Sequence, residues 1–282
     1  MNIWVTGSEG QLGRALQCAA KTSPDSWLFT DREVDITSHE AVRAYAEAHP
    51  VDVIINCAAY TDVERAETEE AVAYRLNAEA VGYLAEVAKE HDALLIHIST
   101  DYVFMGGCCV LLDEGAHPSP INAYGRTKLA GEELILRSGC HAMIFRTAWL
   151  YSAYGKNFVK TMLRLGSERE QLQVVNDQIG SPTYAPDLAE ALLHIISERN
   201  FQEGIYHYTN LGECSWWEFA TEIFRLAGQK VEVKPCSSEE YPSRVNRPKN
   251  AVLDKRKVQQ RLGLHIPHWK ESLQQCIDEL QA

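Results

Sequence analysis

Short apolar runs alternate with longer amphipathic segments through the first half of the chain. The apolar runs lie at residues 3–6, 27–30, 53–57, 94–98 and 143–145. Runs this short and this apolar are typical of strands that are buried on both faces of a parallel sheet. The segments between them have helical periodicity, at residues 10–20, 39–48, 64–75, 78–91 and 127–137. This alternation predicts an α/β fold, with a doubly wound parallel sheet of the Rossmann type.

The pattern changes after about residue 150. Helical segments are predicted near residues 157–165, 187–198, 216–227 and 268–281, and strand candidates lie near 172–175, 205–208 and 231–234. We therefore predict a dinucleotide-binding domain over residues 1–150 and a smaller, mainly substrate-binding portion over residues 151–282. In this prediction, part of the second portion can return to the sheet of the first. Because no low-complexity linker separates the two, we expect one compact body with a cleft.

The composition narrows the range of partners. The 282 residues have a formal net charge of −12, which disfavours broad attraction to nucleic acid or to an anionic membrane. No apolar run approaches the roughly 20 residues that span a bilayer, and the first residues lack the pattern of a signal peptide. Eight cysteines are scattered without a Cys-x-x-Cys pair, so no metal site is predicted. We expect a cytoplasmic protein with reduced thiols.

A glycine-rich turn follows the first predicted strand and opens the first predicted helix. Gly7, Gly10 and Gly13 have the spacing that lets a backbone turn sharply and approach a pyrophosphate closely. The helix that begins there offers free N–H groups and the positive end of its dipole to phosphate groups. Together with Gln11 and Leu12, which lie within the turn, these glycines are predicted to bind NADPH or NADH.

Residues at the ends of the second and third predicted strands complete the predicted cofactor site. Asp31 follows the glycine turn at the usual interval of about 20 residues, where a carboxylate accepts hydrogen bonds from the adenosine ribose. Arg32 beside it is suited to a 2′-phosphate, so the choice between NADH and NADPH stays open. Asp35 and Ile36 are predicted to flank the adenine. The residues that end the third strand are predicted to lie against the cofactor: Ala58, Ala59, Tyr60 and Thr61.

A tyrosine and a lysine lie four residues apart at the start of a predicted helix. This spacing places Tyr124 and Lys128 on one helical face. A free tyrosine has a pKa of about 10, and a nearby ammonium group lowers that pKa and readies the hydroxyl for proton transfer. The same lysine can hold the nicotinamide ribose. Thr100 ends the fourth predicted strand, where ligands bind in such sheets, and is predicted to hydrogen-bond the oxygen that Tyr124 protonates.

Longer and more specific motifs recur along nearly the whole chain. They are NCAAYT at 56–61, STDYVF at 99–104, PINAYGRTKLAGE at 120–132, FRTAWLY at 145–151, NFVKTML at 157–163, NDQIGSPT at 176–183, SW at 215–216 and RP at 247–248. A chain with this set resembles the dTDP-4-dehydrorhamnose reductase family of the extended short-chain dehydrogenase/reductases.

The resemblance implies both a reaction and a substrate. NADPH or NADH would deliver a hydride to the C4 keto carbon of the nucleotide sugar dTDP-4-dehydro-L-rhamnose, with the tyrosine, lysine and threonine in the roles given above. Asp101 would contact the substrate near the same strand end. Trp149 would offer a flat apolar face to the sugar or the base. Arg247 is the candidate for the diphosphate, which the acidic surface would otherwise repel.

Two segments depart from the family pattern. The loop at 105–114 follows the catalytic strand and is less polar than in family members, so its role is left open. Family members that dimerise around magnesium have a glutamate on the first helix, at the position where this chain has Ala15. We therefore expect a monomer or a homodimer that forms without metal.

Three alternative functions stay open. The substrate could be another nucleotide-linked 4-keto sugar. Sugar-nucleotide dehydratases and epimerases share the fold, but a dehydratase needs an Asp-Glu pair where this chain has Asp101 and Tyr102. A non-catalytic subunit resembling the regulatory subunit of methionine adenosyltransferase would not need Thr100, Tyr124 and Lys128, so the presence of all three favours catalysis.

Overall fold

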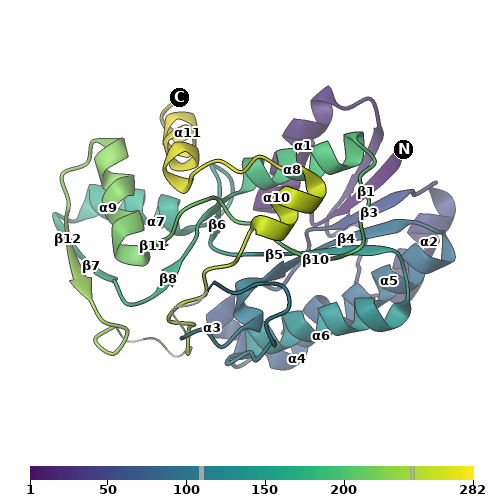
Figure 1. Cartoon of the computed structure of the whole chain (residues 1–282), viewed down its shortest axis with the longest axis horizontal. Helices are drawn as coiled ribbons and strands as arrows, with labels where there is room; N and C mark the ends of the chain where they lie inside the picture. The colour runs from purple at the N-terminus through teal and green to yellow at the C-terminus, as the bar shows by residue number, and fades with distance from the viewer. Residues whose placement is uncertain (108–110, 242, 244) are drawn as a thin grey trace.

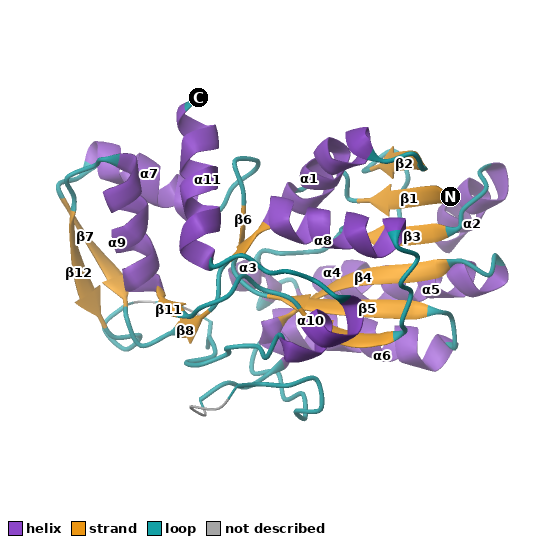
Figure 2. Cartoon of the chain, turned by 45° about the horizontal axis from the view of Figure 1, so that its top comes forward, coloured by secondary structure: helices purple, strands orange, loops and turns teal. Residues whose placement is uncertain are grey.

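A parallel sheet forms the centre of the larger half of the molecule (Figures 1 and 2). The computed structural model describes residues 1–107, 111–241, 243 and 245–282. The sheet has the order β10-β5-β4-β3-β1-β2, and every neighbouring pair is parallel. Its strands are β1 (Asn2–Thr6), β2 (Ser26–Thr30), β3 (Val53–Asn56), β4 (Leu94–Thr100), β5 (Ala142–Thr147) and β10 (Gly204–His207).

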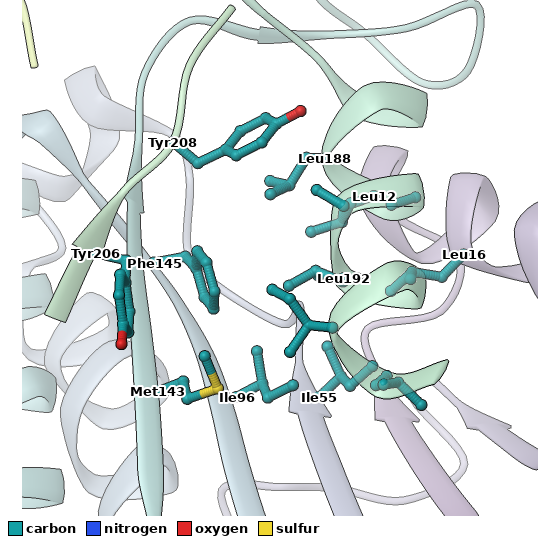
Figure 3. Packing of buried hydrophobic residues seen from close by; sticks show 14 of the residues in the cluster. Leu12, Leu16, Ile55, Ile96, Met143, Phe145, Leu188, Leu192, Tyr206 and Tyr208 are labelled. Atoms are coloured by element: carbon teal, nitrogen blue, oxygen red, sulfur yellow. The ribbon is translucent and has the colours of Figure 1, made fainter. Parts of the chain in front are cut away.

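Helices cover both faces of this sheet. The side chains of β1 alternate, so that Ile3 and Val5 enter one apolar core and Trp4 enters the other. The first core includes residues of α1 (Gln11–Ala19), α8 (Ala185–Ser197) and α10 (Arg256–Leu262), and Figure 3 shows leucines of α1 and α8 facing the strands. The second core includes residues of α2 (His39–Ala48), α5 (Ala80–Glu90) and α6 (Ala123–Ser138). The predicted doubly wound α/β fold is confirmed.

The strand order creates a crevice beside β1. The chain runs from β1 to β2 on one side and then crosses to β3 on the other side, so the connections diverge between β1 and β3. In open α/β sheets, ligands bind at the carboxyl ends of the strands near such a switch point. The glycine-rich turn follows β1 directly and therefore lies at this crevice.

The single helix predicted over residues 64–75 is wrong. The structure has α3 (Val63–Ala66), α4 (Glu70–Tyr74) and a π-helical turn (Arg75–Glu79) that leads into α5. The buried Asn77 in this turn accepts a hydrogen bond from the Tyr60 N–H at 2.8 Å and donates one to the Thr127 hydroxyl at 3.1 Å. These hydrogen bonds stabilise the irregular turn. Helical periodicity in the sequence does not predict it, because the contacts join distant segments.

The C-terminal lobe is assembled from short pieces around its own apolar core. Helices α7 (Phe158–Glu168), α9 (Trp216–Ala227) and α11 (Trp269–Gln281) contribute to that core together with the parallel pair β7 (Gln171–Val175) and β12 (Glu232–Cys236). Two further pairs join segments distant in sequence: β6 (Leu150–Tyr151) with β9 (Thr183–Tyr184), and β8 (Ile179–Gly180) with β11 (Cys214–Ser215). In Figure 2 this lobe lies beside the sheet.

The chain crosses back to the sheet after entering the lobe. Helix α8 packs against α1, and β10 pairs with β5 at the edge of the sheet. The sequence analysis allowed for this return, which means that the sheet half includes residues beyond 150. Among the residues that the structure describes, no helix is both long enough and apolar enough to cross a membrane.

Candidate active site

A cavity of about 1030 Å³ opens at the carboxyl ends of the central strands. It is bounded by the segments that follow β1, β3, β4 and β5, and the C-terminal lobe contributes Trp216 and Arg247. Most residues of the predicted site line this cavity: Gly7, Gly10, Gln11, Leu12, Asp31, Arg32, Asp35, Ile36, Ala58, Ala59, Thr61, Thr100, Asp101, Tyr124, Lys128, Trp149 and Arg247.

The glycine turn is shaped by close backbone contacts. Gly7 has φ +67°, and a Cβ on it would lie 2.6 Å from the backbone nitrogen of Ala58. A Cβ on Gly13 would lie 2.5 Å from the Gly7 carbonyl oxygen, so glycine at this position allows the turn to close. Gly13 itself does not line the cavity. Gly10 caps α1 without a side chain, which leaves the first N–H groups of the helix unobstructed by any capping group. The turn can therefore receive an anionic group at a helix N-terminus.

The carboxyl end of β2 supplies charged groups of both signs. Asp31 and Arg32 both line the cavity, and the Asp31 N–H donates to the Glu33 carboxylate at 2.9 Å. Hydrogen bonds from Thr37 lower the pKa of Asp35, so Asp35 is ionised. Asp31 can accept hydrogen bonds from a ribose, and Arg32 can meet a 2′-phosphate, so both stay predicted cofactor residues.

Tyr60 does not line the cavity, contrary to the prediction. Its N–H and carbonyl groups are both bound by Asn77, and its hydroxyl donates to Glu69 at 2.7 Å. Tyr60 therefore ties the segment after β3 to the π-helical turn. Its neighbours Ala59 and Thr61 remain in the lining.

The start of α6 is held firmly against β4. The Asn122 side chain caps the helix by accepting from the Gly125 N–H at 2.8 Å, and the Ala123 N–H donates to Glu67 at 2.7 Å. A Cβ on Gly125 would lie only 2.1 Å from the carbonyl oxygen of Tyr102. Glycine at this position therefore allows α6 to approach the 3-10 turn Asp101–Val103, which places Tyr124 beside the end of β4.

Thr100 is oriented by its two neighbours. Its hydroxyl donates to the Asp101 carboxylate at 3.1 Å and accepts from the Tyr102 N–H at 3.2 Å. Burial raises the pKa of Asp101 to about 7, although hydrogen bonds from Thr100 and from the backbone oppose the rise. Asp101 thus contacts Thr100 directly and changes its charge near neutral pH.

The structure differs from the expectation that Lys128 lowers the pKa of Tyr124. Burial raises the pKa of Tyr124, while its interaction with Thr100 lowers it. The Lys128 side-chain nitrogen is turned toward β4, where it donates to the Ile98 carbonyl at 2.7 Å and lies 3.2 Å from Nε2 of His97. Tyr124 is therefore protonated at neutral pH, which suits a proton donor.

Two stacked tryptophans form an aromatic wall. Trp149 has φ +48°, and its ring stacks on that of Trp216 with centroids 3.5 Å apart. A Cβ on Gly180 would lie 2.8 Å from the Trp149 ring, so the glycine makes room for it. Sheet half and lobe meet in this pair, which offers a flat apolar surface to a ligand.

Arg247 reaches the catalytic end of β4 from the C-terminal lobe. Its guanidinium donates to the Tyr102 hydroxyl at 3.2 Å and lies 3.6 Å from the Glu64 carboxylate. A second cavity of about 600 Å³ shares Trp216 and Arg247 with the first, and Glu64 lines the second cavity. Arg247 therefore stands where the two cavities meet, and one long ligand can occupy both.

The two segments that depart from the family pattern, the loop at 105–114 and the first helix at Ala15, lie in different parts of the structure. Residues 108–110 of the loop at 105–114 lie outside the described residues. In the rest of the loop, Glu114 accepts a hydrogen bond from the His207 N–H at 3.1 Å, which holds the loop at the edge of the sheet. Ala15 is buried in the core between α1 and α8, and no cluster of three potential metal ligands occurs among the described residues.

Sequence reasoning missed part of the lining. Trp216 lines the cavity, and the SW motif alone assigns it no role; His97 lies behind the lining, against Lys128, and interrupts the apolar pattern of β4. The polar residue within an apolar strand was a signal that could have been used. Other lining residues that were not predicted have no such signal, among them Val63, Leu76, Thr147, Ala148, Gly155 and Lys156.

Comparisons with known proteins agree along the whole chain. The family described as RmlD substrate binding domain matches residues 1–282. A dTDP-4-dehydrorhamnose reductase of Aggregatibacter actinomycetemcomitans is 40% identical, covering 96% of each chain. The crystal structure of a dTDP-4-dehydrorhamnose reductase from Clostridium acetobutylicum is 43% identical with a TM-score of 0.96, covering 100% of each chain. One from Bacillus anthracis, solved in complex with NADP, is 41% identical with a TM-score of 0.92, covering 99% of each chain.

Proposed function

Because the chain belongs to the RmlD substrate binding domain family, we propose that it is an oxidoreductase that converts dTDP-4-dehydro-L-rhamnose to dTDP-L-rhamnose with NADPH or NADH. One observation carries the proposal: Thr100, Tyr124 and Lys128 meet in one cavity with the glycine turn, at the carboxyl end of β4. Relatives about 40% identical over nearly their whole length bear the same activity in their names.

The residues present fit a nicotinamide dinucleotide. Gly7 lets the turn pack against the backbone of Ala58, where no Cβ fits, and the N-terminus of α1 beside it is open to a diphosphate. Asp31 and Arg32 would hold the adenosine ribose or its phosphate, and Lys128 would hold the nicotinamide ribose. The reduced nicotinamide, when bound, supplies the hydride.

Tyr124 is the proton donor in this proposal. Its raised pKa keeps the hydroxyl protonated at neutral pH, and an alkoxide that develops at the C4 oxygen is a stronger base than a phenolate. Thr100 orients the carbonyl by a hydrogen bond to the same oxygen. Asp101 fixes Thr100 through its carboxylate, in addition to any substrate contact.

The C-terminal lobe would hold the nucleotide sugar. Trp149 and Trp216 provide the face against which a sugar ring or a base can stack. Arg247 has the charge and the position to bind a diphosphate between the two cavities. The second cavity then offers space for the nucleoside.

The alternatives are weaker on specific grounds. Tyr102 stands where a dehydratase needs a glutamate, and its hydroxyl is bound by Arg247, so no second carboxylic acid follows Asp101. A regulatory subunit has no need for a cavity that joins a glycine turn to a Thr-Tyr-Lys set. Reduction of another nucleotide-linked 4-keto sugar uses the same chemistry and differs only in what fills the second cavity.

A substrate panel tests the proposal. Purified protein is mixed with NADPH or NADH and with one of a set of dTDP- and UDP-linked 4-keto sugars. The amount of cofactor oxidised is then compared with the amount of sugar reduced. We expect one cofactor oxidised for each dTDP-4-dehydro-L-rhamnose reduced. Conversion of a nucleotide sugar without net cofactor oxidation would indicate an epimerase or dehydratase, and faster reduction of another sugar would reassign the substrate.

The proposal includes a cytoplasmic protein that is a monomer or a metal-free homodimer. Ala15 supplies packing rather than a carboxylate at the position where magnesium-linked relatives have a glutamate. We therefore expect EDTA to leave both the rate and the light-scattering mass unchanged. A dimer that dissociates with chelator would contradict this part of the proposal.

A further inference from the structure

A buried chain of polar side chains leads from the sheet to Lys128. Thr6 on β1 donates to Oδ1 of Asn56 on β3 at 2.8 Å. Nδ2 of Asn56 lies 3.1 Å from Nδ1 of His97 on β4, and Nε2 of His97 lies 3.2 Å from the Lys128 nitrogen. None of the four side chains is more than 1% exposed. The proposed reaction assigns no role to Asn56 or His97.

The orientation of the Asn56 amide is fixed by a backbone group. The Ala58 N–H donates to the same Asn56 atom that accepts from Thr6, at 3.1 Å. A backbone N–H can only donate, so this atom is the amide oxygen. The amide nitrogen therefore faces His97 and donates to Nδ1.

The protonation of His97 follows from this contact. Burial is the main reason why the pKa of His97 lies well below its usual range, so the ring is neutral. A neutral imidazole whose Nδ1 accepts a hydrogen bond has its proton on Nε2. That N–H points at the Lys128 nitrogen. An ammonium has three donors and no acceptor, whereas a neutral amine can accept from Nε2 and donate to the Ile98 carbonyl.

We propose that His97, backed by Asn56, is a positioning residue that holds Lys128 as a neutral amine, and that the pair sets the pH range in which Lys128 becomes charged. A charged Lys128 needs the proton of His97 on Nδ1, which requires the Asn56 amide to turn over. Turning the amide would place its NH₂ group against the Ala58 N–H and break that hydrogen bond.

The other groups around Lys128 are consistent with this balance. Burial lowers the pKa of Lys128 to about 8, while Glu132 on α6 and Cys57 after β3 raise it. Lys128 therefore takes up its proton as the pH falls through about 8. The consequence for the rate rests on the proposed function, but the charge state of Lys128 does not.

Replacing Asn56 by aspartate reverses the donor pattern. In Asn56→Asp, a carboxylate accepts from Thr6, from the Ala58 N–H and from Nδ1–H of His97, which leaves Nε2 free to accept from an ammonium. The pKa of Lys128 should rise by about 1 or more, a tenfold gain in proton affinity. Thr6→Val is the matched control, because it removes one donor to Asn56 but leaves Ala58 to fix the amide.

The titration is followed by NMR on protein labelled with ¹³Cε-lysine, with the Lys128 signal assigned by its loss in Lys128→Met. We expect Lys128 to titrate near 8 in the wild type and in Thr6→Val, and at higher pH in Asn56→Asp. The pH profile of kcat should move in parallel.

Two results would overturn the inference: a wild-type Lys128 that titrates above about 10, or an unchanged titration in folded Asn56→Asp. If Asn56→Asp does not fold, the wild-type titration still decides. Absence of turnover on every sugar would overturn the proposed function and leave this measurement intact.

Discussion

The sheet half and the C-terminal lobe are built in different ways. In the sheet half, every strand pairs in parallel within one continuous sheet whose two faces have separate apolar cores, one of which is drawn in Figure 3. In the lobe, strands occur as separate pairs, and helices α7, α9 and α11 form most of the core. The groups of the proposed chemistry lie on the sheet half, at the end of β4 and the start of α6. Of the groups proposed to recognise the nucleotide sugar, Trp216 and Arg247 lie on the lobe, and Trp149 lies where the two halves meet.

In this arrangement the residues proposed for the chemistry lie on the more rigid half, where the distances between their reacting atoms are fixed. Thr100, Tyr124 and Lys128 are attached to elements locked by caps, buried hydrogen bonds and close glycine contacts. Arg247 lies on an irregular segment of the lobe and is held by side-chain contacts to Tyr102 and Glu64. Variants in the two halves should therefore affect different kinetic constants, chemistry in one and binding in the other.

Tyr124→Phe should have the largest effect. The change removes the hydroxyl that would donate the proton, and a positioned general acid contributes about 10²- to 10⁴-fold to a rate. We expect kcat to fall by that factor, with cofactor affinity and thermal stability close to those of the wild type. Tyr102→Phe is the control, because its ring lies 5.5 Å from that of Tyr124 in the same cavity. An equal loss in both variants would show that Tyr124 is not the donor.

Gly125→Ala should be the next most severe change. The new methyl group would lie 2.1 Å from the Tyr102 carbonyl oxygen and push α6 away from β4. A displacement of about 1 Å at a catalytic group can cost 10²-fold in rate, and overpacking costs about 1–3 kcal/mol of stability. Both kcat and the free energy of unfolding are measured.

Gly82→Ala is the matched helix control for this change. A Cβ on Gly82 would meet only Leu134, at 3.4 Å, which is ordinary contact. Alanine within α5 should leave kcat unchanged and add about 0.5–1 kcal/mol of stability. If Gly125→Ala were as harmless as Gly82→Ala, the close approach of α6 would not control the position of Tyr124.

The same division explains how much the sequence predicted. Strands of the sheet half can be predicted because both of their faces are buried, so a run such as 53–55 is apolar at every position. Groups at strand ends could be placed together because parallel strands share one carboxyl edge. Thr100, Asp31 and the glycine turn are predicted on these grounds, and the longer motifs add Trp149 and Arg247.

The features that the sequence did not predict depend on contacts between segments that are distant in the chain. Pairing of β10 with β5 and stacking of Trp216 on Trp149 join residues that no local pattern relates. The π-helical turn exists because Asn77 bridges Tyr60 and Thr127. The direction in which the pKa of Tyr124 moves depends on its burial, which the spacing to a lysine does not show.

Asp101→Asn should change how the free energy of unfolding depends on pH, because burial of the Asp101 carboxyl destabilises its charged form. The pKa of Asp101 rises from 3.8 in the unfolded chain to about 7, so folding binds its proton and the wild type loses stability as pH rises through this range. The variant lacks this loss. Relative to the wild type it should gain about 2 kcal/mol in free energy of unfolding between pH 5 and pH 8.

Denaturant unfolding at the two pH values measures this difference. Asp92→Asn is the control, because Asp92 is an exposed carboxylate in a turn. The two variants should diverge only as the pH rises. A constant difference between Asp101→Asn and wild type would mean that Asp101 titrates normally in the folded protein.

Arg247→Ala should have the smallest effect and the most selective one. If the lobe only binds substrate, removing this guanidinium raises KM for the nucleotide sugar by about tenfold and leaves kcat within about threefold, because uniform binding is lost. Cofactor affinity should not change. Arg247→Lys should recover only part of the loss, since an ammonium cannot bind a diphosphate with two parallel hydrogen bonds. Arg256→Ala, which removes an exposed arginine paired with Asp254, controls for net charge. A fall in kcat as large as that of Tyr124→Phe would place Arg247 in the chemistry and erase the distinction between the two halves.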